Sequence, residues 1–153
     1  GGMLLIVAAY LGIPSGRRWV LNRPPAWMAA FHAWRLAPGI YFLVLYGQGL
    51  LPWRFAVPGG WGDIAVAVTA PLVGFLVGDK TRARRGILIG WHVLAFIDLA
   101  QVVVSATRLR LEGDPLILSL GSEFPLYLLP LFAVPITLAA HILAIAGLWV
   151  RRS

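Results

Sequence analysis

The sequence predicts an all-α membrane protein, a single bundle of about five transmembrane helices. Of its 153 residues, 59% are hydrophobic and only 12% carry a formal charge, whereas a soluble domain has about 25% charged residues. A soluble domain of this length must also cover its surface with polar groups, and this composition cannot supply them. The apolar residues gather in long segments between short basic clusters. We therefore expect residues 1–153 to form one polytopic transmembrane domain.

Four apolar segments are long enough to cross a bilayer, which takes about 20 residues: 26–51, 61–78, 86–107 and 126–150. Backbone polar groups in lipid must be bonded within the segment, so these segments are predicted to be helices. Residues 3–13 form a shorter apolar run, which we interpret as a short or truncated first helix. Turns are predicted at Pro58-Gly59-Gly60 and at Gly113-Asp114-Pro115.

The basic residues are distributed unequally between the two sides of the predicted bundle. One side has nine (Arg17, Arg18, Arg23, Lys80, Arg82, Arg84, Arg85, Arg151, Arg152) and the other has three (Arg54, Arg108, Arg110). Loops rich in Lys and Arg stay in the cytoplasm. We therefore expect a multi-pass protein of a bacterial inner (plasma) membrane, with its N-terminus outside and its C-terminus cytoplasmic.

This placement of charge also indicates the partners. The net charge of +7 comes from short clusters between apolar runs, so membrane lipid is expected and nucleic acid is not. Small residues spaced four apart, as at 74–78 and 86–90, suit close helix contacts with a membrane-protein partner or a second copy.

The absence of cysteine excludes disulfides and thiolate sites. No nucleophile elbow, HExxH or phosphate loop is present, so catalysis is not favoured.

Three histidines lie at a similar depth in the predicted helices. With a rise of 1.5 Å per residue, His32, His92 and His141 are roughly 10, 9 and 13 Å from the cytoplasmic ends of their helices. His92 and His141 are candidate axial ligands for haem b or another tetrapyrrole. Small residues beside them would admit a flat macrocycle: Gly86, Gly90, Ala144 and Gly147. Arg84 and Arg85 are candidate partners for haem propionates.

Two other interpretations of the histidines stay open. The three together could bind a bare zinc or copper ion, with His32 as the weakest candidate, although no acidic residue is expected at their depth to support a metal. Alternatively they pack between helices, hydrogen-bonded to groups such as Trp91 or Thr137.

Arg35 and Asp98 are predicted to form a buried ion pair. They lie at a similar depth in their helices, and pairing offsets the cost of burying either charge in lipid. Gln48 and Asp63 are expected in the outer half of the bundle, where they add polar groups that a proton or solute path would need.

The stretch Asn22-Arg23-Pro24-Pro25-Ala26-Trp27, followed by Trp34 and Tyr41, resembles the translocator-protein family. The resemblance implies a five-helix, Trp-rich membrane protein associated with porphyrins. It is confined to residues 22–41, and the Trp- and Asn-bearing signature of that family's later helices is missing, so it does not assign the chain to that family.

The sequence therefore leaves three functional hypotheses. The first is a non-catalytic subunit or pocket protein that holds a tetrapyrrole through His92 and His141. The second is a cofactor-free structural or assembly subunit of a membrane complex. The third is a small carrier or channel.

Overall fold

The computed structural model describes residues 24–77, 81–120 and 127–150, which form a bundle of helices without a strand among them. In chain order the elements are α3 (Pro25–Ala30), η1 (Phe31–Arg35), α4 (Leu36–Gly47), α5 (Trp53–Leu72), η2 (Val73–Val77), α6 (Arg82–Leu111), α7 (Pro115–Leu120), η3 (Leu129–Ala133) and α8 (Val134–Val150). The all-α prediction is confirmed. The expected first helix at 3–13 lies outside the described residues.

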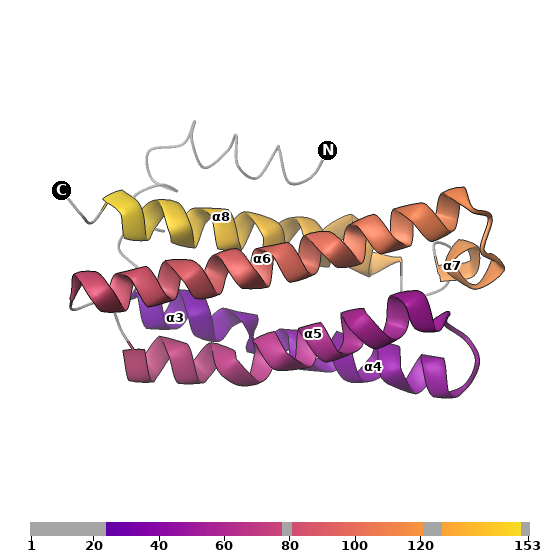
Figure 1. Cartoon of the computed structure of the whole chain (residues 1–153), viewed down its shortest axis with the longest axis horizontal. Helices are drawn as coiled ribbons and strands as arrows, with labels where there is room; N and C mark the ends of the chain where they lie inside the picture. Colours follow the sequence, from indigo (N-terminus) through magenta and orange to yellow (C-terminus); the bar gives the residue numbers. More distant parts are fainter. Residues whose placement is uncertain (1–23, 78–80, 121–126, 151–153) are drawn as a thin grey trace.

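Four continuous helical segments are long and apolar enough to span a membrane: Ala26–Gly47, Trp53–Val77, Arg82–Leu111 and Leu129–Val150. Figure 1 shows them running up and down the bundle, with α6 along its full length. The short helix α7 lies across one end, which we call the α7 end. At the opposite end α6 begins and α8 finishes.

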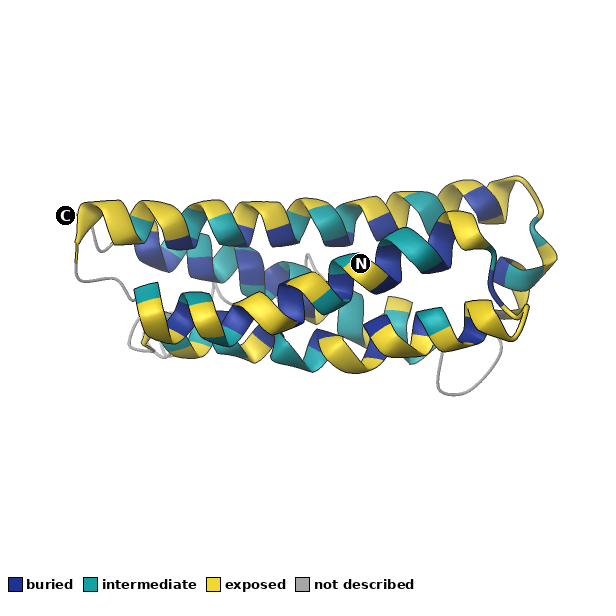
Figure 2. Cartoon of the chain, turned by 60° about the horizontal axis from the view of Figure 1, so that its bottom comes forward, coloured by how far each residue is buried: buried dark blue, intermediate teal, exposed yellow. Residues whose placement is uncertain are grey.

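The surface of the bundle is largely apolar, and several ionisable side chains are buried within its otherwise apolar interior. The helices turn their buried faces toward one another (Figure 2), and His32, Arg35 and His92 are each at most 1% exposed. Large apolar side chains such as Phe75 and Leu94 are instead exposed. A bundle with apolar side chains outside and ionisable ones inside is suited to a lipid environment.

The predicted turn at Pro58-Gly59-Gly60 is wrong, because α5 runs through it from Trp53. The two glycines are helix-packing residues instead. A Cβ added at Gly60 would lie 2.8 Å from the Leu43 side chain and 3.0 Å from the Gly39 carbonyl oxygen. Small residues here let α4 and α5 approach closely, as is common between membrane helices. The turn between these helices lies earlier, where Gly49 has φ +71° and Pro52 precedes α5.

The second predicted turn is confirmed. The α6 helix ends at Leu111, and Gly113 then takes φ +78°, a conformation that glycine adopts at little cost. Asp114 directly precedes α7, and its Oδ1 accepts hydrogen bonds from the backbone N–H groups of Leu116 (3.0 Å) and Ile117 (3.1 Å). The Ile117 side chain is buried, so α7 is anchored to the end of the bundle.

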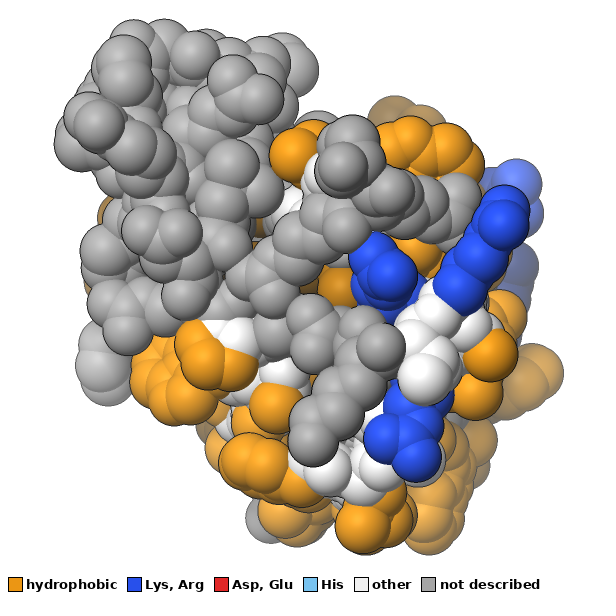
Figure 3. All heavy atoms as spheres, turned by 90° about the vertical axis from the view of Figure 1, so that its left-hand side faces the viewer, with side chains coloured by type: hydrophobic (Ala, Val, Ile, Leu, Met, Phe, Trp, Pro, Cys, Tyr) orange, Lys and Arg blue, Asp and Glu red, His pale blue; other side chains and the backbone are white. Residues whose placement is uncertain are grey.

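Apart from the buried Arg35, the described basic residues gather at the two ends of the bundle. Figure 3 views the end where α6 begins, and Lys and Arg side chains cluster on this face. Arg82, Arg84 and Arg85 lie there, in the first turn of α6. We call this the basic end. The last turn of α6 carries Arg108 and Arg110, and at the same end Arg54 pairs with Glu112 at 3.0 Å.

Candidate metal centre and buried ion network

A short 3₁₀ segment positions two of the buried ionisable side chains. Residues Phe31–Arg35 form η1, in which His32 and Arg35 are the buried residues. In a 3₁₀-helix with three residues per turn, side chains at i and i+3 eclipse. His32 and Arg35 therefore leave the backbone on one face, which points into the bundle.

His32, His92 and His141 form one buried cluster. Each side chain is 0% exposed, and one ring nitrogen from each lies within 4.8 Å of the other two. The Nδ1 atoms of His92 and His141 are 3.1 Å apart. The ring of His32 stacks on that of His141, with centroids 3.8 Å apart and an interplanar angle of 5°.

Most of the imidazole nitrogens in this cluster have no hydrogen-bond partner within the described residues. This applies to both nitrogens of His32 and to Nε2 of His92 and of His141. The partners expected for a packing role are engaged elsewhere: Trp91 Nε1 donates to Thr69 Oγ1 at 3.0 Å, and Thr137 Oγ1 donates to the Ala133 carbonyl at 2.7 Å. Buried polar atoms are normally hydrogen-bonded, so this concentration of unpaired nitrogens needs a physical explanation.

The structure places the rings of His92 and His141 closer together than two axial ligands of a bound macrocycle would lie. Two axial nitrogens bound at about 2 Å on opposite sides of one metal are about 4 Å apart, with the macrocycle between the rings. Here the rings are in direct contact, with centroids 5.3 Å apart and an angle of 72° between them, and His32 covers one face of His141.

The residues expected to accommodate a macrocycle are also placed differently. A Cβ added at Gly86 or Gly90 would meet nothing within 4 Å, because both glycines are exposed on the outside of α6. Ala144 and Gly147 are buried in α8. Arg84 and Arg85 lie in the first turn of α6, about two helical turns before His92.

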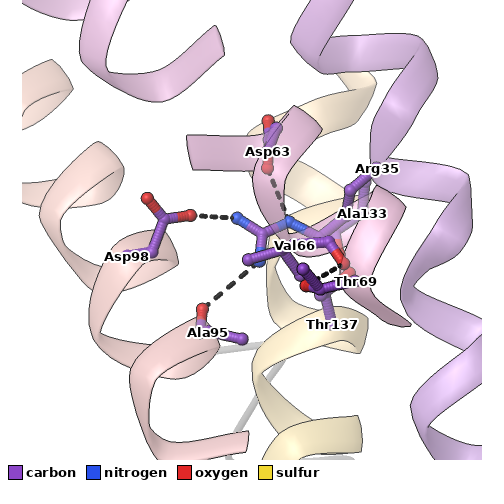
Figure 4. Close-up of polar contacts among 8 residues, drawn as sticks. All are labelled: Arg35, Asp63, Val66, Thr69, Ala95, Asp98, Ala133 and Thr137. Atoms are coloured by element: carbon purple, nitrogen blue, oxygen red, sulfur yellow. Dashed lines mark hydrogen bonds and ion pairs between the residues drawn. The ribbon is translucent and has the colours of Figure 1, made fainter. Parts of the chain in front are cut away.

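Arg35 is the centre of a buried ion network (Figure 4). Its Nη2 lies 2.6 Å from Asp98 Oδ2, so the structure brings together the two residues expected to pair. Its Nε lies 2.5 Å from Asp63 Oδ1, and Nη1 donates to the Ala95 carbonyl at 3.3 Å. The side chains of Arg35 and Asp63 are 1% and 5% exposed, and that of Asp98 is 22% exposed. Three helices are thus joined through one guanidinium group.

Asp63 was missed as a partner because the start of its helix was misplaced. A helix beginning at Trp61 puts Asp63 near the membrane surface, whereas the observed start at Trp53 places it ten residues, about 15 Å, into the bundle. Glycines provide the space for the network. A Cβ at Gly62 would collide with the Asp98 carboxylate, and one at Gly39 would lie 2.9 Å from the Asp63 Cβ.

The histidine cluster and the ion network are adjacent. His32 is one 3₁₀ turn from Arg35, and His92 is less than two α-helical turns from Asp98. With both carboxylates ionised, one guanidinium and two carboxylates carry a formal charge of −1. In that state a net negative group lies beside the three imidazoles in the interior of the bundle.

Comparison with known proteins identifies one family. The family model described as "Domain of unknown function (DUF8737)" matches residues 1–149. Searches of curated proteins and of solved structures give no match.

Proposed function

We propose that this chain, which belongs to the DUF8737 family, is a multi-pass membrane protein that binds a transition-metal ion through His32, His92 and His141. The observation that carries the proposal is the convergence of three buried imidazoles whose nitrogens are largely unpaired. A metal ion would use these lone pairs and offset the cost of burying them.

The spacing of the rings supports a single ion. Metal–nitrogen bonds of about 2.0–2.1 Å in a tetrahedral site separate the ligand nitrogens by about 3.4 Å. The His92 and His141 Nδ1 atoms, which hydrogen-bond to each other at 3.1 Å, are close to this spacing, and a metal ion would replace that hydrogen bond. The third donor, on His32, is within 4.8 Å of the others, so this ring would have to move closer to complete the site. Three protein ligands leave a fourth position for an exchangeable group, as in open zinc sites.

The chemistry of the donors limits the choice of ion. Imidazole suits zinc and copper better than magnesium or calcium, which prefer oxygen. The three imidazoles are neutral, and the cost of burying an ion in a low-dielectric interior rises with the square of its charge. The formal charge of −1 on the Arg35 network balances a single positive charge. The proposal therefore favours copper(I), with zinc(II) as the competing ion.

The proposal also includes the subcellular location and orientation of the protein. The protein resides in a bacterial inner membrane with the basic end in the cytoplasm, supported by the nine-to-three excess of Lys and Arg in the sequence segments predicted for that side. The metal site then lies in the cytoplasmic half of the bundle.

Metal analysis of the protein purified in detergent tests the proposal. Wild-type protein equilibrated separately with copper(I) and zinc(II), then desalted, should retain about one equivalent of ion by mass spectrometry of the metal. H32A, H92A and H141A should each reduce retention about tenfold or more, because each removes one of three ligands. The matched control is W91F: Trp91 lies against His92, with centroids 5.0 Å apart, but offers no metal ligand.

Two results would overturn the proposal. A folded wild-type protein that retains neither ion would leave the histidines as packing residues of a structural subunit. A Soret band that depends on His92 and His141, in protein purified from haem-supplied cells, would replace the bare ion with a tetrapyrrole.

A further inference from the structure

A cavity of about 250 Å³ lies in the half of the bundle nearer the α7 end. It is larger than engineered apolar cavities of about 150 Å³, which hold a benzene-sized molecule. Its walls are formed mainly by apolar side chains from six elements, including Phe42, Phe55, Val102, Ile117, Leu129 and Val134. The cavity is separate from the three histidines, none of which lines it.

One end of this cavity carries a positive charge. Val102 and Arg110 both line it, and eight residues of α6 separate them, so it follows that helix for about 12 Å. Arg110 lies in the last turn of α6 and is exposed. In the described part of the chain, the ion pair at this end joins Arg54 to Glu112, and Arg110 makes no ion pair. The apolar cavity therefore ends at a cation at the level of the helix ends.

The wall opposite α6 is built from an irregular helix. Leu129 and Pro130 line the cavity and belong to the π-helical segment η3. Single π-helical turns are often found at functional sites. Val103 on α6, which also lines the cavity, is 38% exposed, and Pro130 is exposed as well. The cavity is therefore open to the surrounding lipid between α6 and η3.

From this arrangement we propose that the cavity binds one acyl chain of a membrane phospholipid, with the lipid phosphate held by Arg110. The chain would enter between α6 and η3 and lie along the apolar residues from Ala106 to Val102. Arg110 presents several N–H donors to the phosphate oxygens, the geometry in which arginine binds phosphate best. Arg110 would thus bind the phosphate of the lipid, and the apolar lining would bind its acyl chain.

Lipid retention by the detergent-purified protein tests this site, with phosphatidylglycerol as the probe. Native mass spectrometry of wild-type protein should show one bound lipid after delipidation and readdition. A106F, which fills the cavity, and R110Q, which removes the cation, should each lower the bound fraction about tenfold. The controls are V104F and R108Q. Val104 and Arg108 are exposed on the same helix and do not line the cavity, and their substitution should leave retention within about twofold of wild type.

Equal losses in R110Q and R108Q would overturn the phosphate assignment, and equal retention in A106F and V104F would overturn the acyl-chain assignment. Retention of detergent or free fatty acid without phospholipid would overturn the proposal as a whole. If A106F fails to fold, R110Q still decides the phosphate assignment, because Arg110 is exposed and its substitution leaves the core intact. Metal retention by the same variants should be unchanged, which separates this test from that of the histidine site.

Discussion

The ion network around Arg35 allows a quantitative prediction about the stability of the bundle. Replacing Arg35 with Met leaves two carboxylates, one of them on a side chain only 5% exposed, without their shared cation. Breaking a buried ion pair costs on the order of 3–5 kcal/mol because a charge is left uncompensated. We expect R35M to lower the free energy of unfolding by at least this amount.

The aspartates should be less sensitive than Arg35. D63N and D98N each remove one carboxylate and leave Arg35 paired with the other. Each should cost about 1.5–3 kcal/mol, the usual contribution of a hydrogen bond to a charged group. D98N should lie at the lower end, because the Asp98 side chain is 22% exposed and water partly replaces the lost contact. The expected order of destabilisation is therefore R35M, then D63N, then D98N.

Reversible unfolding in mixed detergent micelles, followed by tryptophan fluorescence, measures these differences. The triple variant R35M/D63N/D98N removes all three formal charges and should recover part of the loss seen in R35M, since no buried charge remains unpaired. The reasoning is refuted if the three losses simply add in the triple variant, or if D98N is as destabilising as R35M.

Three further predictions concern topology and packing. A reporter fused after Ser153 should be cytoplasmic and one inserted within residues 108–125 external; the reverse result would invert the proposed orientation. G60A should destabilise the bundle by about 1–3 kcal/mol, because the new Cβ meets the Leu43 side chain at 2.8 Å. G90A, where nothing lies within 4 Å, should be neutral or slightly stabilising in the same unfolding assay. D114A should cost about 0.5–2 kcal/mol by removing the side-chain cap of α7; an unchanged unfolding free energy would show that α7 does not need this cap.

Membrane helices and the approximate depth of their ionisable residues could be predicted from the sequence, because both follow from apolar length and helical rise. The approach of Arg35 to Asp98 and the convergence of the histidines are consistent with that depth estimate. The packing role of Gly59 and Gly60 could not be predicted from the sequence, because a Pro-Gly-Gly sequence is also typical of a turn. Only the position of the neighbouring helix shows that these glycines form a helix contact. Asp63 was misplaced by that same error. The direction in which Gly86 and Gly90 face depends on the orientation of α6 about its own axis. The sequence does not predict this orientation, because apolar residues lie on all sides of the helix.

The five residues of η1 have a consequence for how this protein can change over evolutionary time. His32 and Arg35 reach two different sites from one stretch of chain, and each residue of a 3₁₀-helix turns the next side chain by about 120°. Insertion or deletion of a single residue between them would turn one of the two side chains away from the interior. Any change in the length of this segment therefore affects the histidine cluster and the ion network at once.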